Sequence, residues 1–564
     1  MFLSRLAAGP WQRERVLLLA SLLLLLVGNR RFLAQALAGR EALDPSAWGF
    51  GLALAAGLVA LNFLLLALVA WGRLFKPAVV LMFVLAAGTA FFADSYGTVI
   101  DPAMLRNAMH TYWGEARELL GGRLLLWLLL GAALPAWLLW RLPLAPRAWP
   151  RALAVRAGSI ALALVVLVGA IWAVFQPLSS LMRNHRELRY LVTPGNVLWS
   201  AAVVARGSNQ PAAGPLLAVG TDAAPGPTLL RAPRPRLVVL VVGETARAAN
   251  WGLNGYARQT TPELARLPLV SFPDVTSCGT DTETSLPCMF AATGRRQYDE
   301  RRIRGSENVL HVLARAGVGV HWRDNQAGCK GVCAGFPQDT VASLAPPGLC
   351  NDGHCLDEGL LANLEALLPG PRPDAAGAGQ PQPARFIVLH QLGNHGPAYY
   401  RRVPPAFKHF VPACEQDDLR RCDASAIVNA YDNALLYTDH VLARLIAQLQ
   451  AREGTLDSAV LYVSDHGESL GEHGLFLHGV PFAFAPDVQT RVPMFLWFSA
   501  GFPGARQLDA ACLARRAGRE PASHDNLFHT LLGLFDVRTT AREAQLDLTE
   551  GCTAASAEVV ARQP

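Results

Sequence analysis

Five apolar stretches in the first third of the chain constrain its fold more than any other feature. They cover about residues 16–38, 48–71, 77–93, 124–140 and 156–175 of a 564-residue sequence. A helix that spans the hydrocarbon core of a bilayer needs about 20 mostly apolar residues, and most of these stretches are long enough. We therefore expect residues 1–175 to form a transmembrane domain with five helices.

The first stretch also allows a second interpretation, as a signal peptide. Arg13 and Arg15 precede its apolar run, and the "ALA" at 36–38 resembles a cleavage site. Arg30 and Arg31 lie between the run and that site, where charge is unusual in a signal peptide. We favour a retained helix, and the signal peptide remains the alternative.

Basic residues in the connecting loops predict how the helices are oriented, because cytoplasmic loops carry an excess of Lys and Arg. Such residues precede the first stretch and cluster at the second and fourth connections: Arg5, Arg13, Arg15, Arg73, Lys76, Arg141, Arg147, Arg151 and Arg156. This pattern favours a cytoplasmic N-terminus. Five crossings then leave everything after residue 175 outside the cytoplasm.

The cysteines independently indicate an oxidising compartment. All ten follow residue 277, in close pairs with one distant pair: Cys278, Cys288, Cys329, Cys333, Cys350, Cys355, Cys414, Cys422, Cys512 and Cys552. An even number confined to one exported region is typical of a disulfide framework. The alternative is a zinc ribbon, because Cys329 and Cys333 have a spacing suited to metal ligands.

Residues 176–235 connect the membrane region to the rest of the chain. The polar, amphipathic part up to residue 206 predicts a helix along the membrane surface, broken at Pro194 and Gly195. The part from about 207 to 235 is rich in Gly, Pro and Ala and predicts a linker. We expect the exported domain to occupy residues 236–564.

Short β-rich runs alternate with helical patterns in this exported domain. Runs begin near residues 236, 317, 385, 458 and 492, and helical patterns cover 307–316, 357–368 and 425–451. Alternation of this kind predicts an α/β/α fold with a mainly parallel sheet. The modest net charge of +6 gives no case for binding nucleic acid.

Acidic residues and histidines follow several of the predicted strands. Glu244 ends the first run, His390 and His395 follow a second, and Asp465 and His466 follow a third. Active sites of such sheets lie beyond the carboxyl ends of the strands, where these side chains would meet. The sequence therefore predicts a divalent metal site at that edge.

The loop "SCGTDTETSLPCMF" at 277–290 offers several hydroxyl groups between two cysteines. A hydroxyl is a poor nucleophile at neutral pH, but metal coordination or the start of a helix favours its anion and binds phosphate. The "SLPCMFAATG" that follows can form such a helix. The spacing does not choose among Thr280, Thr282 and Thr284.

Several motifs, in the same order over nearly the whole chain, resemble the phosphoethanolamine transferases that modify lipid A in Gram-negative bacteria. That family includes the colistin-resistance enzymes, and its exported domain is of the alkaline phosphatase/sulfatase type. The similar stretches are "VVGETARAANWGLNGY" (241–256), "SCGTDTETSLPCMF", "RDNQAGCKGVC" (323–333), "VLHQLGNHGPAYY" (388–400), "YVSDHGESLGEHGLFLHG" (462–479) and "SHDNLFHTLLGL" (523–534), with "YGTVIDPAMLRNAMHTYWGEARELL" (96–120) and "RNHRELRYLVTPGN" (183–196) before them.

The resemblance assigns roles residue by residue. It implies zinc ligands at Glu244, Thr282, Asp465 and His466, with Thr282 as the nucleophile. It also implies that Lys330, His395 and His478 contact the transferred phosphate or a second zinc, and that Asn107, Thr111 and Glu115 line a pocket for the donor lipid. The disulfides implied are 278–288, 329–333, 350–355 and 414–422, which leaves 512–552.

The resemblance also implies the reaction and its setting. Phosphoethanolamine would pass from phosphatidylethanolamine to Thr282 and then to a lipid A phosphate, which gives polymyxin resistance. We expect a multi-pass, monomeric protein of the inner membrane with its catalytic domain in the periplasm. Asp281 and Glu283 depart from the family pattern beside Thr282, and a helix beginning near Thr282 would bring them nearer the metal.

Other functions remain alternatives. A membrane-anchored zinc phosphodiesterase would use water as the acceptor, and a related transferase would modify another envelope glycan. A sulfatase is disfavoured, because the Cys-x-Pro-x-Arg motif that begins its nucleophile loop is absent here. A non-catalytic lipid sensor should have lost its nucleophile or its ligands, and suitable residues fill all these positions.

Overall fold

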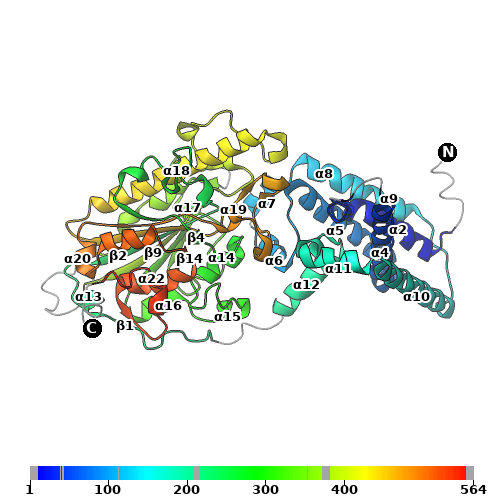
Figure 1. Ribbon diagram of the computed structural model, residues 1–564, viewed down its shortest axis with the longest axis horizontal. Helices are drawn as coiled ribbons and strands as arrows, with labels where there is room; N and C mark the ends of the chain where they lie inside the picture. Colours follow the sequence, from blue (N-terminus) through cyan, green and yellow to red (C-terminus); the bar gives the residue numbers. More distant parts are fainter. Residues whose placement is uncertain are drawn as a thin grey trace. The chain divides into compact units, whose positions relative to one another are not determined.

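The chain folds into two compact units, one built from helices and one around a sheet (Figure 1). The computed structural model describes residues 10–38, 40, 44–111, 113–208, 215–351, 354–370 and 382–553. The first unit comprises Met1–Ala108 and Leu119–Asn209, and the second comprises Met109–Glu118 and Gln210–Pro564. The short segment Met109–Glu118 therefore belongs to the second unit, although it lies between two membrane helices in the sequence.

The first unit contains the predicted apolar helices. Among the residues that the structure describes, four spans are long and apolar enough to cross a membrane, and a bent pair of helices makes up to five. The spans are Pro45–Val69 (α4), Gly72–Tyr96 (η1 and α5), Gly122–Arg141 (α8, η2 and α9) and Trp149–Ala173 (α10), with Arg13–Gly28 (α2) and Arg30–Ala36 (α3) as the bent pair. Each predicted stretch therefore corresponds to one of these elements.

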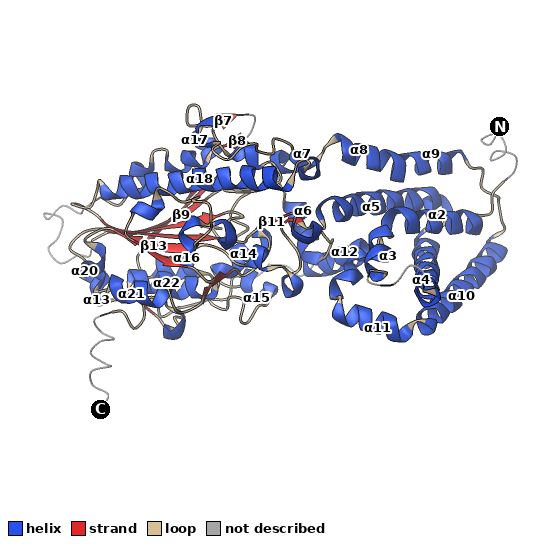
Figure 2. Ribbon diagram, turned by 45° about the horizontal axis from the view of Figure 1, so that its top comes forward, coloured by secondary structure: helices blue, strands red, loops and turns tan. Residues whose placement is uncertain are grey.

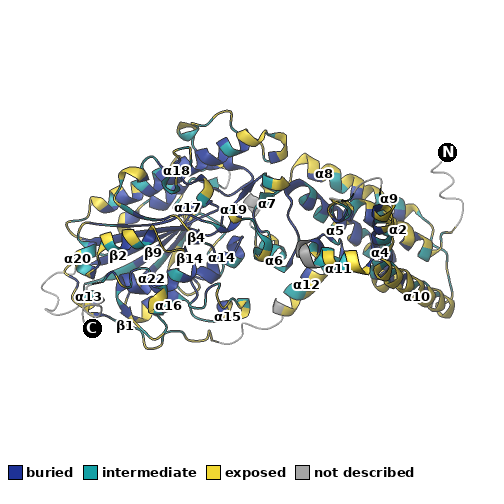
Figure 3. Cartoon of the chain, viewed as in Figure 1, coloured by how far each residue is buried: buried dark blue, intermediate teal, exposed yellow. Residues whose placement is uncertain are grey.

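Helix α10 exposes much of its apolar surface (Figure 3). Trp172 is 82% exposed, and Leu162 and Val168 are more than half exposed. Contact of such side chains with water costs about 25 cal/mol for each Å² of apolar surface. Exposure on this scale is typical of helices whose surroundings are lipid.

The first apolar stretch bends at the polar interruption that the sequence contains. Helices α2 and α3 meet at an angle of 63°. At the break the buried Asn29 donates from Nδ2 to the Thr193 carbonyl at 2.7 Å and accepts from the Thr193 N–H at 3.0 Å. Leu17 and Leu24 of α2 pack in the core of this unit. The stretch is thus an integral part of the folded unit, as the retained-helix interpretation requires.

The segment after the last span is helical and interrupted where predicted. Helix α11 (Phe175–Asn184) and a 3-10 helix η3 (Arg186–Leu191) precede α12 (Gly195–Ser208), which begins directly after Pro194. The expected linker is partly wrong, because Ala224–Pro225 (β1) pairs with Val537–Arg538 (β15) and Pro227–Leu230 forms α13. These residues belong to the fold of the second unit.

A seven-stranded sheet forms the centre of the second unit (Figure 2). Its strand order is β3-β13-β10-β2-β9-β5-β6; the five strands from β10 to β6 are parallel, and β13 pairs antiparallel with both β10 and β3. The strands are Leu269–Phe272 (β3), Met494–Phe498 (β13), Asp457–Ser464 (β10), Arg236–Gly243 (β2), Ala384–His390 (β9), Gly319–Asp324 (β5) and Gln338–Thr340 (β6). The predicted α/β fold with a mainly parallel sheet is confirmed.

Helices cover both faces of this sheet, which explains why its central strands are apolar along most of their length on both faces. Side chains alternate between the faces of a strand. In β2, Val238 and Leu240 pack with α16 (Val309–Arg315) and α22 (Asp525–Phe535), whereas Leu237 and Val239 pack with α18. Helix α18 (Ala424–Gln450) lies along the opposite face from α22 (Figure 1).

One predicted helix is wrong, and one predicted set of bonds is confirmed. Residues 357–368 form two 3-10 helices, Asp357–Leu361 (η7) and Leu364–Leu367 (η8), because Asn363 between them adopts a left-handed conformation (φ 50°). The disulfides that the resemblance implied are present: Cys278–Cys288, Cys329–Cys333, Cys350–Cys355, Cys414–Cys422 and Cys512–Cys552. Cys329 and Cys333 therefore form a disulfide rather than part of a zinc ribbon.

Candidate active site

Two adjacent parallel strands deliver three charged side chains to one point at the carboxyl edge of the sheet. Glu244 follows β2, and Asp465 and His466 follow β10. All three are buried, and each offers a ligand atom that lies within 4.8 Å of the other two. These three residues form a cluster suited to a metal ion, as their strand-end positions predicted, whereas His390 at the end of β9 pairs with Asp324 Oδ2 at 2.8 Å instead.

Backbone hydrogen bonds fix the orientation of this cluster. Asp465 Oδ1 accepts from the N–H of Thr245 at 3.2 Å and from that of His466 at 2.8 Å. Its Oδ2 is buried and accepts no hydrogen bond from any residue that the structure describes. His466 Nδ1 lies 2.9 Å from the Gly467 carbonyl, which only accepts, so Nδ1 carries the proton and Nε2 faces Glu244 Oε1 at 3.3 Å.

The electrostatics of the cluster favour a bound cation. Burial and then the charge of Glu244 raise the pKa of Asp465 to about 6. Burial also opposes ionisation of Glu244, but the hydrogen bond and charge of His466 hold the pKa of this carboxyl below its usual range. Two buried carboxylates so close together repel each other unless positive charge lies between them.

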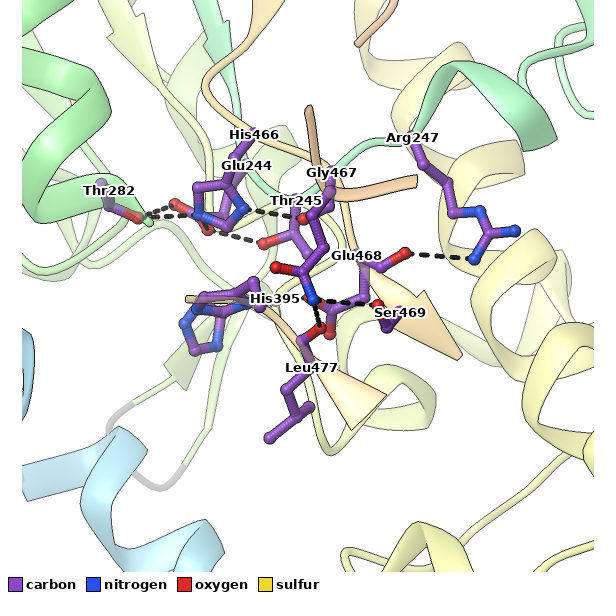
Figure 4. A network of polar contacts seen from close by, with 12 residues as sticks. Glu244, Thr245, Arg247, Thr282, His395, His466, Gly467, Glu468, Ser469 and Leu477 are labelled. Carbon is purple, nitrogen blue, oxygen red and sulfur yellow. Dashed lines mark hydrogen bonds and ion pairs between the residues drawn. The ribbon is translucent and has the colours of Figure 1, made fainter. Parts of the chain in front are cut away.

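Of the three candidate threonines, Thr282 is the one whose hydroxyl contacts the cluster within the described residues. Helix α14 (Thr282–Met289) begins at this residue, as the sequence led us to expect. Thr282 Oγ1 lies 3.1 Å from Glu244 Oε2 and 3.4 Å from His466 Nε2 (Figure 4). The hydroxyl of Thr280 instead donates to the Val480 carbonyl at 2.7 Å. Thr282 thus lies next to the cluster that could bind a metal, and it is also the first residue of a helix, where anions bind favourably.

Asp281, the residue before Thr282, has a structural function. It is the N-cap of α14, and its side chain accepts from the Thr284 N–H at 2.9 Å. We expect Asp281→Ala to lower the free energy of unfolding by about 1 kcal/mol, because an N-cap contributes about that much. Asp281→Asn is the matched control, since Asn caps equally well. Equal denaturation midpoints for the two variants would contradict the capping function.

The second unusual acid, Glu283, does not point toward the metal-like cluster as the helical turn led us to expect. Its buried carboxylate pairs with Arg304 Nη2 at 2.6 Å and lies 3.1 Å from His110 Nδ1. Arg304 also donates to the main-chain carbonyl of Glu283 at 2.7 Å. The negative charge beside Thr282 is therefore neutralised locally, which removes the expected repulsion of an anionic substrate.

Two further predicted histidines border the cluster. The His478 ring lies 4.4 Å from that of His466 and 5.3 Å from that of His395, centroid to centroid. Glu468 Oε2 lies 2.8 Å from His478 Nδ1, and Tyr399 donates to Glu468 Oε1 at 2.6 Å. Glu468 thus fixes the Nδ1–H tautomer of His478 and leaves its Nε2 available.

The remaining predicted residues lie elsewhere in the described chain. Lys330 Nζ donates to the Ala327 carbonyl of its own loop at 3.3 Å. Asn107 is part of α6 (Pro102–His110), and Thr111 follows that helix directly. Glu115 belongs to α7 (Trp113–Leu119), and its side chain lies outside the described residues.

Sequence reasoning placed Glu468 at this edge but missed two side chains that support the predicted site residues, Tyr399 and His524. The buried His524 accepts the Cys278 N–H at 2.9 Å and lies 2.9 Å from the Ser464 carbonyl. Burial lowers the pKa of His524 to about 4, so it remains neutral and makes both contacts. His524 belongs to the family motif at 523–534, which indicated that it has a function. The sequence spacing did not indicate that it contacts the loop at Cys278.

Comparison with protein families assigns both units. A family model described as phosphoethanolamine transferase EptA/EptB matches residues 58–208, and a model described as sulfatase matches residues 236–537. The second match covers more than half of the chain. The sulfatase-type fold of the second unit therefore accompanies a membrane region found in phosphoethanolamine transferases.

Individual relatives cover nearly the whole chain. Phosphoethanolamine transferase EptA of Salmonella typhimurium is 38% identical over 479 residues, which is 84% of each chain. Phosphatidylethanolamine transferase Mcr-1 of Escherichia coli is 38% identical over 82% of this chain and 84% of its own. The solved structure of lipooligosaccharide phosphoethanolamine transferase A from Neisseria meningitidis, an integral membrane protein, matches with a TM-score of 0.90 and 34% identity over 96% of this chain and 98% of its own. The chain therefore belongs to the phosphoethanolamine transferase family.

Proposed function

We propose that the protein transfers phosphoethanolamine from phosphatidylethanolamine to a lipid A phosphate, with Thr282 as the nucleophile. The observation that carries this proposal is the position of the Thr282 hydroxyl. It lies at the first residue of α14 and within 3.4 Å of both Glu244 and His466. A hydroxyl in that position is suited to attack phosphorus, because the positive end of the helix dipole favours an anionic substrate.

Zinc fits the cluster as its resident metal. Glu244, Asp465 and His466 would supply oxygen and nitrogen ligands, and Thr282 Oγ1 would supply a fourth. The buried Asp465 Oδ2, which accepts no hydrogen bond within the described residues, supports this assignment. When bound, zinc lowers the pKa of a coordinated hydroxyl and neutralises charge on phosphoryl oxygens.

The first displacement loads the enzyme. Thr282 Oγ1 forms a bond to the phosphorus of phosphatidylethanolamine as the bond from phosphorus to the glycerol oxygen breaks. Glu244 Oε2, which the Thr282 hydroxyl contacts at 3.1 Å, accepts the proton of Thr282. We assign His395 and His478 to the leaving glycerol oxygen, which takes a proton from the imidazolium form of one of them as diacylglycerol departs.

The second displacement transfers the phosphoethanolamine from Thr282 to the acceptor. A lipid A phosphate oxygen attacks the phosphorus held on Thr282, and the bond to Oγ1 breaks, so the hydroxyl is restored. We assign Lys330 to the charge that develops on the phosphoryl group, since an ammonium on a flexible stem suits an anion that changes geometry. Asn107, Thr111 and Glu115 are our candidates for the pocket that binds the donor lipid.

The proposal also includes the location of the protein in the cell. We propose a monomeric enzyme of the bacterial inner membrane, anchored by residues 1–175, with its catalytic domain in the periplasm. The apolar spans and the five disulfides support this location, because disulfides persist outside the cytosol. Transfer to lipid A would give resistance to polymyxins.

Lipid profiling tests the reaction. Cells that express the protein should accumulate lipid A carrying phosphoethanolamine and lose it when Thr282 is replaced. Unchanged lipid A together with phosphoethanolamine on another envelope glycan would identify a different acceptor. Release of free phosphoethanolamine without any modified glycan would identify a phosphodiesterase instead.

Removal of the membrane region should separate metal binding from transfer. We expect the domain from about residue 215 to fold in an oxidising compartment and bind zinc, because the cluster and all disulfides lie within it. The soluble domain of the N. meningitidis enzyme, 42% identical over 99% of its length with a TM-score of 0.56, has been crystallised by itself. We expect at least about tenfold slower transfer to lipid A in membranes, since the donor lipid is no longer positioned.

The control for this truncation is the full chain, purified and assayed in the same membranes. Zinc content is measured in both proteins by metal analysis. Transfer at the rate of the full chain would show that the membrane region acts only as an anchor.

A further inference from the structure

The segment Met109–Glu118 attaches to the catalytic unit at two points. His110 near its start lies 3.1 Å from the Glu283 carboxylate, next to Thr282 in the sequence. Glu118 at its end pairs with Arg402 Nη2 at 2.8 Å. The first contact therefore lies one residue from Thr282. The second lies one hydrogen bond from His395, because Arg402 also bonds to that residue.

The Glu118–Arg402 pair is buried on both sides. The Glu118 side chain is fully buried and that of Arg402 is 3% exposed. Glu118 Oε1 makes no hydrogen bond within the described residues and lies 3.6 Å from His354 Nε2. A buried ion pair loses its hydration and often adds nothing to the free energy of unfolding. This pair is better explained by the orientation that it imposes on neighbouring groups.

Arg402 provides that reason, because it extends the pair to the active site. Its Nε donates to the main-chain carbonyl of His395 at 3.0 Å, and this bond is also buried. With Nη2 on Glu118 and Nε on His395, the planar guanidinium is held in a single orientation. The carboxylate of Glu118 thus fixes the group that holds the backbone of His395.

The same short helix supports the second histidine. Arg402 ends the 3-10 helix η10 (Tyr399–Arg402), and Tyr399 begins it. Tyr399 donates to Glu468, which holds His478 Nδ1. One turn of helix therefore fixes both His395, which Figure 4 shows beside the cluster, and His478, and the two rings lie 5.3 Å apart in edge-to-face contact.

We infer that Glu118 is a positioning residue for the transfer reaction. It orients Arg402, and through Arg402 and η10 it sets the placement of the two histidines that assist the leaving group. A residue from a loop between membrane helices thus completes the support of the catalytic histidines. This inference rests on the proposed function, because it assigns Glu118 a part in the same reaction.

Steady-state kinetics of the full-length protein test this inference, with zinc loaded and phosphatidylethanolamine vesicles as donor. We expect Glu118→Gln and Arg402→Gln each to lower kcat at least about tenfold, because a misplacement of 1 Å can cost about a hundredfold in rate. The KM for the donor should change less than about twofold, since the variants keep the contacts that bind the donor equally in the ground state and in the transition state. The double variant should be no slower than the slower single variant, because both substitutions break the same connection.

Neighbouring arginines provide matched controls. Arg117 is exposed beside Glu118, and Arg401 forms an exposed pair with Asp417 beside Arg402. Arg117→Gln and Arg401→Gln should keep the wild-type kcat. Should Glu118→Gln fail to fold, Arg402→Lys keeps the positive charge but lacks the two-pronged geometry, and it should still lower kcat at least about tenfold with an unchanged melting temperature.

Each outcome has one meaning. An increase in KM with an unchanged kcat would overturn the inference, because Glu118 would then only shape the donor site. Wild-type kcat per folded molecule, in variants with a lowered melting temperature, would overturn it as well by showing a purely structural function. Absence of any transfer by the wild-type protein would instead refute the proposed function itself.

Discussion

Thr282→Ala is expected to lower phosphoethanolamine transfer by at least about a thousandfold, the scale typical of losing a covalent nucleophile. Without Oγ1 no bond to phosphorus can form at the start of α14. The fold should persist, because within the described residues the lost hydroxyl contacts only the side chains of Glu244 and His466. Transfer of labelled headgroup from phosphatidylethanolamine to lipid A is the measurement.

Thr280→Ala and Thr284→Ala are the matched controls in the same loop. Thr280 donates to the Val480 carbonyl, and Thr284 contributes its backbone N–H to the Asp281 cap, which alanine preserves. Both variants should retain transfer within about tenfold of the wild type. Near-normal transfer by Thr282→Ala together with loss in either control would show that another threonine is the nucleophile.

His466→Ala should remove metal and activity together. We expect zinc affinity to fall by at least about a hundredfold. Loss of a residue that only hydrogen-bonds to a metal ligand already lowers metal affinity by about 10- to 100-fold, and His466 would be a ligand itself. The two buried carboxylates would then lack both the imidazole and the cation that balance their charge. Metal analysis after dialysis against a weak chelator and the transfer assay are made on the same sample.

His473→Asn is the control for this variant. His473 lies in the same loop, is exposed, and adopts a left-handed conformation that Asn tolerates. Its zinc content and transfer should equal those of the wild type. Full zinc content in His466→Ala would show that the cluster of Glu244, Asp465 and His466 is not the metal site.

The sequence predicted the parts of the fold that depend on simple periodicity. Buried strands such as β2 and β10 are apolar along most of their length because helices cover both of their faces. Their identity as parallel neighbours then places Glu244 and Asp465 at one edge without further information. The metal-like cluster was therefore predictable from strand ends alone.

Other features depend on contacts between distant segments, which periodicity does not encode. Glu283 looked repulsive in the sequence because its partner Arg304 lies 21 residues away. Glu118 and Arg402 are 284 residues apart, and nothing local distinguishes either from a surface charge. The 3-10 helices at 357–368 were mistaken for one helix because a left-handed Asn363 leaves the apolar pattern unchanged.

Mass spectrometry of the loaded enzyme tests the central claim most directly. The purified full-length protein is incubated with phosphatidylethanolamine in the absence of lipid A, digested, and the peptide that contains Thr282 is analysed. We predict phosphoethanolamine on Thr282 that disappears when lipid A is added. An unmodified Thr282 in a preparation that transfers phosphoethanolamine, or the adduct on another residue, would contradict the mechanism.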